Sequence, residues 1–195
     1  LLMFKRKVNA VFNGKPSKIK YEYQPYDSIS DNIKLAVICA EDQKFVEHNG
    51  FDINSIEKAL KESRKRTRGA STISQQTAKN IFLWEGRSWL RKGLEAYFTI
   101  LIELIWGKKR ILEVYLNCIE MGYMTFGAEA AAKQFYQTTA RQITKDQAAT
   151  IAATLPNPRI FKAYKPSPYV IKRKKWILQQ MKILGKDYLK KINEM

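Results

Sequence analysis

The residues best suited to chemistry lie in three short segments, at positions 40–50, 68–80 and 91–95. The first segment places Glu41 and Asp42 at the end of an apolar run with helical spacing. The second is rich in hydroxyl and amide side chains and contains a lysine, and the third sets one carboxylate beside two cations. In a strongly basic chain, carboxylates among neutral hydrogen-bonding side chains indicate a site for a hydroxylated, anionic substrate. This pattern is typical of an enzyme rather than of a scaffold.

Length and charge limit the classes of protein that this sequence can belong to. The 195 residues fit one domain with a buried core, and the formal net charge is +17, from 35 Lys and Arg against 18 Asp and Glu. Such an excess favours a polyanionic partner: nucleic acid, an anionic membrane surface or a phosphate-bearing substrate. Because no zinc-finger, ribonucleoprotein or basic-zipper pattern is present, we expect no nucleic-acid partner. Cys39 and Cys118 are too few for a disulfide framework, and Cys39 is expected to be a small buried residue.

His48 is the only histidine, which argues against a zinc site or a Ser-His-Asp triad. We expect it to make a structural hydrogen bond beside Glu41 and Asp42. Glu95 lies in an apolar helix, where an unpaired charge is costly, so the neighbouring cations at 91 and 92 should pair with it. A structural salt bridge and a functional carboxylate both remain open for Glu95.

The expected fold is a mainly α domain. Polar caps and turn residues predict where most helices begin and end. A weak strand pattern within 8–23 predicts a small β-hairpin or an edge strand. Residues 94–106 are apolar on nearly every face, which predicts a buried central helix. Glu103 and Glu113 are expected to be packed and hydrogen-bonded. The first predicted helix begins at Ser30, and Asn49-Gly50 ends either this helix or a turn just past it. The other predicted helices span 54–65, 72–83, 88–107, 110–117, 128–136, 144–155 and 168–184.

Five segments together resemble glycosyltransferase family 51, the peptidoglycan glycosyltransferases, in its monofunctional form. The similarity extends over about residues 21–184, and the motifs occur in the family's order. One departure is the loop within 118–126, where Tyr123-Met124-Thr125 replaces a more acidic or glycine-bearing sequence. The matching motifs are Glu41-Asp42-x-x-Phe45-x-x-His48-x-Gly50, Gly69-x-Ser71-Thr72-Ile73-x-Gln75-Gln76-x-x-Lys79-Asn80, Arg91-Lys92-x-x-Glu95, Arg110-Ile111-Leu112-Glu113-x-Tyr115-Leu116-Asn117 and Ala153-x-Leu155-Pro156-Asn157-Pro158.

The resemblance implies a lysozyme-like fold with a larger head lobe and a smaller, membrane-facing jaw lobe. Residues 21–195 would form the glycosyltransferase domain, and residues 1–20 a juxtamembrane segment. The apolar residues 1–4 before Lys5-Arg6-Lys7 fit either the stump of a truncated membrane helix or a local strand. The family reaction polymerises lipid II at the outer face of the bacterial cytoplasmic membrane, to which the full-length protein would be attached by a single span. The implied partners are lipid II, the growing lipid-linked strand, an anionic membrane surface and other cell-wall synthesis proteins.

The resemblance also implies roles for individual residues. Glu41 would be the general base, and Glu95 would either orient cations or hold a divalent metal ion, Mg²⁺ or Mn²⁺; no organic cofactor is implied. A lysozyme-like hydrolase that uses the same two carboxylates and a non-catalytic scaffold are the alternatives. The implied cations for the pyrophosphate are Lys79, Arg87 and Lys92, and the other implied substrate-binding residues are Ser71, Thr72, Gln76, Asn80, Asp42 and His48.

Overall fold

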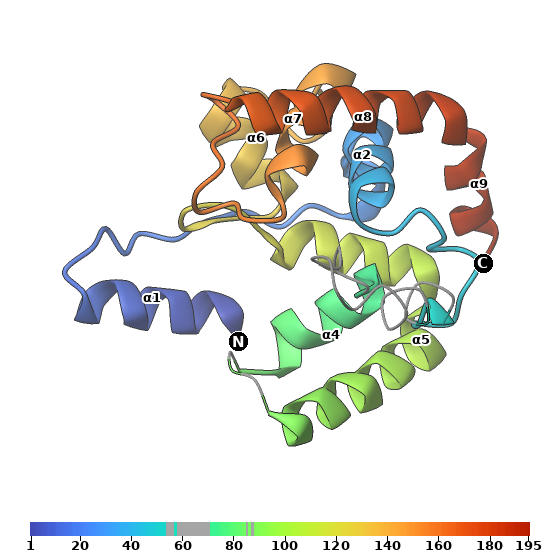
Figure 1. The fold of residues 1–195 in the computed structure, drawn as a ribbon, viewed down its shortest axis with the longest axis horizontal. Coiled ribbons are helices and arrows are strands. Elements are labelled where there is room, and N and C mark those ends of the chain that lie inside the picture. The colour runs from blue at the N-terminus through green and yellow to red at the C-terminus, as the bar shows by residue number, and fades with distance from the viewer. Residues whose placement is uncertain (54–56, 58–70, 85, 87) are drawn as a thin grey trace.

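A computed structural model describes residues 1–53, 57, 71–84, 86 and 88–195, and it confirms the mainly α fold (Figure 1). The predicted helix at 54–65 and the basic loop at 64–69 lie largely or wholly outside the described residues. The helices are α1 (Leu2–Phe12), α2 (Asp31–Glu41), α4 (Ile73–Phe82), α5 (Trp89–Cys118), α6 (Ala128–Tyr136), α7 (Lys145–Thr154), α8 (Pro168–Leu184) and α9 (Asp187–Glu194), with a 3₁₀ turn at Tyr26–Ser28.

Local capping hydrogen bonds begin most of these helices where the sequence predicts. Ser30 caps α2, and Ser88 caps α5. Thr72 and Thr144 each form a full capping box, with Gln75 and Gln147 as their partners. Helix α2 ends at Glu41, and a series of turns and bends at 43–50 follows it. Asn49-Gly50 therefore lies in the turn region just past the helix, the second of the two predicted possibilities.

Of the two structures predicted for residues 8–23, the β-hairpin is wrong and the edge strand is confirmed, since β1 (Lys20–Tyr21) lies at one edge of the small sheet. Residues 2–12 form α1, and the Asn13-Gly14 pair ends this helix instead of turning a hairpin, with Gly14 at φ +60°. Only β1 is extended in this region, and it pairs in parallel with β3 (Thr125–Phe126). The antiparallel hairpin of the fold is formed far downstream by β2 (Glu120–Gly122) and β3. Strand pairing thus depends on a distant partner, which a local sequence pattern does not contain.

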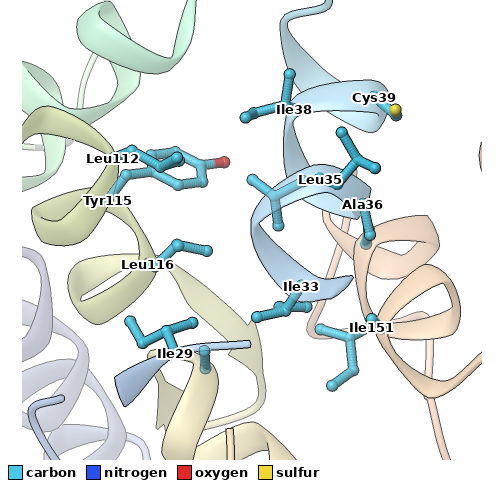
Figure 2. Packing of buried hydrophobic residues seen from close by; sticks show 14 of the residues in the cluster. Ile29, Ile33, Leu35, Ala36, Ile38, Cys39, Leu112, Tyr115, Leu116 and Ile151 are labelled. Atoms are coloured by element: carbon cyan, nitrogen blue, oxygen red, sulfur yellow. The ribbon is translucent and has the colours of Figure 1, made fainter. Parts of the chain in front are cut away.

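The larger part of the molecule is built around α2, which packs against α7 and α8 (Figure 1). Its core joins Ile33 and Ile38 of α2 to Leu112 and Leu116 of α5 and to Ile151 of α7 (Figure 2). The smaller part consists of α4 packed along the N-terminal half of α5 (Figure 1). This division into a larger and a smaller lobe agrees with the expected lysozyme-like architecture.

Helix α5 joins the two predicted helices at 88–107 and 110–117 into one element with a kink at Gly107, whose φ is +67°. The prediction of a buried central helix is wrong for its first half. Leu104 and Ile105 are 78% and 71% exposed, whereas Glu95 and Thr99 are buried. The polar residues recur at intervals of four, so they share the face that packs on α4. Ile102 and Phe98 also pack inward, whereas several other apolar residues point outward.

Candidate active site

A cleft of about 630 Å³ lies where the end of α2, helix α4, the start of α5, strand β2 and the loop at 155–159 meet. This cleft brings together residues from four of the five sequence motifs. The candidate site residues that line it are Glu41, Ser71, Gln76, Lys79 and Asn80, and they are joined by Arg91, Glu120, Asn157 and Arg159.

Glu41 lies in the wall of this cleft as the last residue of α2. Gln76 Nε2 donates to Glu41 Oε2 at 3.0 Å, and Arg173 Nη2 lies 3.7 Å from Glu41 Oε1. Burial raises the pKa of Glu41, and this effect exceeds the opposing effects of the Gln76 hydrogen bond and of the charges on Arg173 and Lys79. A carboxylate with a raised pKa accepts a proton more readily, which suits a general base.

Gln76 is itself held in one orientation by Tyr115. The hydroxyl of Tyr115 donates to Gln76 Oε1 at 3.2 Å, so the amide nitrogen of Gln76 faces Glu41. Tyr115 is fully buried in α5, and Figure 2 shows its hydroxyl pointing toward α2. Desolvation holds the pKa of Tyr115 well above its usual value, so this hydroxyl keeps its proton. Tyr115, Gln76 and Glu41 thus form a chain of two hydrogen bonds that ends at the cleft.

Three of the candidate substrate-binding residues lie behind the cleft wall instead. His48 Nε2 is 3.0 Å from both carboxylate oxygens of Asp42, and Asp42 Oδ2 accepts from the backbone N–H of Ile73 at 3.0 Å. His48 Nδ1 accepts from the Gly50 N–H at 3.1 Å, so Nε2 carries the proton that is donated to Asp42. Thr72 Oγ1 donates to the carbonyl of Gly50 at 2.6 Å.

These bonds join the end of α2 and the segment 48–50 to the N-terminus of α4. None of Asp42, His48 and Thr72 lines the cleft, and the structural hydrogen bond expected for His48 is confirmed. Gly50 is required here, because its φ is +90° and a Cβ atom would lie 2.7 Å from Thr99 Cγ2. The network therefore fixes the positions of Glu41 and of α4, which carries the polar residues facing the cleft.

Lys79 and Asn80 offer donors to a ligand from α4. Lys79 is exposed at the cleft, and Asn80 is buried there, with an Nδ2 that has no hydrogen-bond partner among the described residues. A buried donor without a partner is costly, and a substrate oxygen would remove that cost. Arg87, the third expected cation for the pyrophosphate, lies outside the described residues.

Glu95 does not line the cleft. It is buried, one of its oxygens accepts from Arg91 Nη1 at 3.3 Å, and Lys92 Nζ pairs with the other. The expected pairing with both cations is confirmed. Arg91 lines the cleft, whereas Lys92 lines a separate shallow pocket with Ser88. Among the described residues, Arg91 is therefore the one that links Glu95 to a ligand in the cleft.

The surroundings of Glu95 do not fit a metal site. Both carboxylate oxygens are already paired with cations, and the part of the chain that the structure describes has no group of three His, Cys, Asp or Glu residues that could hold a metal ion. Glu103 and Glu113 are packed and hydrogen-bonded as expected. Glu103 pairs with Lys108, and Glu113 accepts from the Tyr26 N–H.

Sequence reasoning missed Arg173, which contacts Glu41. It lies in a run of basic residues at 172–175, but its side chain is only 14% exposed and donates to the carbonyl of Ala40 at 3.0 Å. A signal was present: Arg173 is three residues after Val170 and four before Ile177, and both of these are buried. Glu120 and Arg159 were missed as well, because both follow the matched motifs without belonging to them.

Comparisons with known proteins agree with this geometry. The family model described as "Transglycosylase" matches residues 7–182. The biosynthetic peptidoglycan transglycosylase of Pseudomonas syringae pv. syringae is 53% identical over 195 residues, which cover 98% of this chain and 83% of that protein. The proteins of the same name from Chromohalobacter salexigens and Bacteroides thetaiotaomicron are 53% and 54% identical, covering 95% of this chain and 80% and 75% of their own lengths. The chain therefore belongs to the transglycosylase family.

Proposed function

We propose that this chain polymerises peptidoglycan glycan strands from lipid II, with Glu41 as the general base. The family match and the names of the relatives support glycan-chain polymerisation, and with it a role in the cell envelope and a peptidoglycan-type substrate. The observation that carries the assignment of Glu41 is its place in the cleft, where it is half-buried, has a raised pKa and is oriented by Gln76.

In the proposed reaction, the 4-hydroxyl of an acceptor N-acetylglucosamine attacks the anomeric carbon of a lipid-linked N-acetylmuramic acid. The α-linked donor becomes a β-1,4 bond, so one displacement is sufficient and no covalent intermediate is needed. Glu41 takes the hydroxyl proton as the bond forms. A positioned general base of this kind typically contributes a factor of about 10²–10⁴ in rate.

The leaving group is polyprenyl pyrophosphate, which departs as an anion and needs positive charge around it. Lys79, Asn80 and Arg91 line the same cleft as Glu41 and can donate to its oxygens. We assign Glu95 the role of a positioning residue that holds Arg91. Arg87 remains a predicted third cation for the pyrophosphate, beside Lys79 and Arg91. Ser71 and Gln76 are further polar residues at the cleft surface.

A lysozyme-like hydrolase is not favoured. Such a hydrolase would need both Glu41 and Glu95 at the glycosidic bond, because its sugar leaving group requires a carboxyl group as general acid beside a second carboxylate. Glu95 lies outside the cleft lining and is paired with two cations, so it cannot reach and protonate a glycosidic oxygen there. A scaffold without activity would not need a half-buried carboxylate at the cleft.

We further propose that the first half of α5 faces the membrane at the outer side of the bacterial cytoplasmic membrane. Its outward residues form an unusually large exposed apolar surface, and the net charge of +17 favours anionic lipid. No helix among the described residues is long and apolar enough to cross a membrane, and the single-span anchor stays a prediction. The exposed apolar residues of this surface are Trp89, Leu90, Tyr97, Ile100, Leu104 and Ile105.

Incubation with lipid II in detergent tests the proposed function directly. The wild-type chain should produce glycan strands that a muramidase degrades, and Glu41→Gln should bind lipid II yet produce none. Release of sugar reducing ends from finished peptidoglycan, without polymer from lipid II, would identify a hydrolase instead. Lipid II binding without either product would identify a scaffold.

A further inference from the structure

A second cavity, which we call the side cavity, adjoins the cleft between α1 and the β2–β3 hairpin. Its volume is about 310 Å³, and it shares three lining residues with the cleft: Arg6, Glu120 and Arg159. A ligand in the cleft could therefore extend a substituent into the side cavity. The remaining lining residues of the side cavity are Asn9, Ala10, Asn13, Lys15, Tyr123 and Met124.

The side cavity is suited to an anionic group. Arg6, Lys15 and Arg159 supply three cations, against the single carboxylate of Glu120. Arg159 is exposed, with its guanidinium 6.0 Å from the ring centroid of Tyr123, so it faces the cavity region rather than the protein core. Guanidinium groups bind carboxylates through paired, charge-assisted hydrogen bonds.

Glu120 gives the side cavity a hydrogen-bond acceptor as well. It is only 4% exposed, and its Oε2 accepts from Arg6 Nε at 2.9 Å, which attaches α1 to the hairpin. Its Oε1 has no hydrogen-bond partner among the described residues. Burial raises the pKa of Glu120, and this effect exceeds the opposing effects of the hydrogen bond and charge of Arg6, of the charge of Arg159 and of the backbone N–H of Met124. A buried acceptor without a partner is costly, and a ligand N–H would satisfy it.

Cations together with an acceptor fit a peptide better than a phosphate. A peptide with acidic residues carries both carboxylates and N–H groups, whereas a phosphate group at neutral pH offers mainly acceptors. The volume corresponds to about ten water molecules at roughly 30 Å³ each. The cavity therefore has room only for the part of a peptide nearest its point of attachment.

We propose that the side cavity binds the acidic peptide that the N-acetylmuramic acid of the substrate carries. This inference rests on the proposed function, because the sugar must lie in the cleft beside Glu41 for its peptide to enter the side cavity. The cations bind carboxylates of the peptide, and Glu120 accepts one of its N–H groups while holding Arg6 in place. The side cavity would thus make the enzyme sensitive to the charge of the peptide.

The test compares two lipid-linked substrates that differ only in charge: one with the acidic peptide, and one in which the carboxylates of the peptide are converted to amides. Polymerisation is measured in a non-ionic detergent for the wild type, Arg159→Gln and Lys15→Gln. Arg141→Gln is the matched control, because Arg141 is exposed and does not line the cleft or the side cavity. For the acidic substrate, Arg159→Gln should lower kcat/KM by about tenfold, the effect of one hydrogen bond to a charged group.

Lys15→Gln, whose residue lines the side cavity but not the cleft, should show a similar loss of about tenfold with the acidic substrate. With the amidated substrate, Lys15→Gln should differ from the wild type by less than about twofold, and Arg141→Gln should match the wild type with both substrates. An equal loss with both substrates would overturn the inference. A loss that occurs only when anionic phospholipid is added would also overturn it, by assigning the side cavity to a lipid headgroup. Polymer formation from both substrates at rates unchanged in every variant would overturn the inference while leaving the proposed function intact. Absence of polymer from either substrate with the wild type would instead refute the proposed function on which the inference rests.

Discussion

Replacement of Tyr115 by phenylalanine tests whether the orientation of Gln76 matters for Glu41. The substitution removes one hydroxyl from a fully buried ring and leaves the packing of α5 against α2 almost unchanged. Gln76 Oε1 then loses its donor, and the amide is free to rotate its oxygen toward the carboxylate of Glu41. The hydrogen bond at 3.0 Å between Gln76 Nε2 and Glu41 Oε2 would be weakened or lost.

A hydrogen bond to a charged group contributes about 1.5–3 kcal/mol, which corresponds to a factor of about 10–100 in an equilibrium constant. The bond from Gln76 favours the ionised form of Glu41, so its loss raises the already raised pKa of Glu41 further. Because the base acts only when deprotonated, the acidic limb of the pH–rate profile should move to higher pH. On that limb we expect kcat to fall by about tenfold, the lower end of the range of about 10–100. This loss should become smaller as the pH rises.

Steady-state polymerisation of lipid II across a pH series provides the measurement. KM should change little, because Tyr115 does not line the cleft. Tyr188→Phe is the matched control: its hydroxyl is also buried, donates to the carbonyl of Gln43 and accepts from the Val46 N–H. Both variants should lose about 1 kcal/mol of unfolding free energy, but only Tyr115→Phe should change the pH profile. Identical pH profiles for the two variants would refute the proposed role of the Tyr115–Gln76 pair.

Three further outcomes are expected. Glu41→Gln should lower kcat by a factor of about 10²–10⁴ with lipid II binding retained, and near-normal turnover would exclude Glu41 as the base. Lys79→Gln should weaken the binding of pyrophosphate-bearing ligands at least about tenfold more than the binding of ligands without that group. An equal loss of affinity for both kinds of ligand would indicate a structural role for Lys79. The chain should sediment with anionic vesicles and be released as salt rises, unless the apolar surface of α5 also inserts. In that case Leu104→Asn should weaken the part of the binding that resists salt, since a leucine buried in the membrane contributes about 1.5–3 kcal/mol. If the wild type binds neutral and anionic vesicles equally and without dependence on salt, its charge does not cause the membrane binding.

The sequence determined where most helices begin because capping is local. Ser30, Thr72 and Thr144 each accept a hydrogen bond from a backbone N–H two or three residues later, so a few adjacent residues contain the whole signal. The ion pairs of Glu95 with cations three and four residues away are predictable for the same reason, since helical spacing alone brings them together. The sequence motifs also identified most of the residues that line the cleft.

Only the tertiary structure decided which side chains face the cleft. Asp42, His48 and Thr72 lie in the same motifs as Glu41 and Gln76, yet they bond to one another behind the wall. The first half of α5 buries Glu95 and Thr99 and exposes Leu104 and Ile105, the reverse of what hydrophobicity predicts for these residues. Residues 2–12 became a helix rather than half of a hairpin.

Arg173 shows most clearly what the sequence could not determine. It is one of four consecutive basic residues, and no local pattern assigns its partner, because Glu41 lies more than a hundred residues earlier on another helix. The packing of α8 against α2 turns this one cation toward the carboxylate. Hydrogen bonds between residues a few positions apart can be predicted from the sequence, whereas contacts between distant elements form only when those elements pack together.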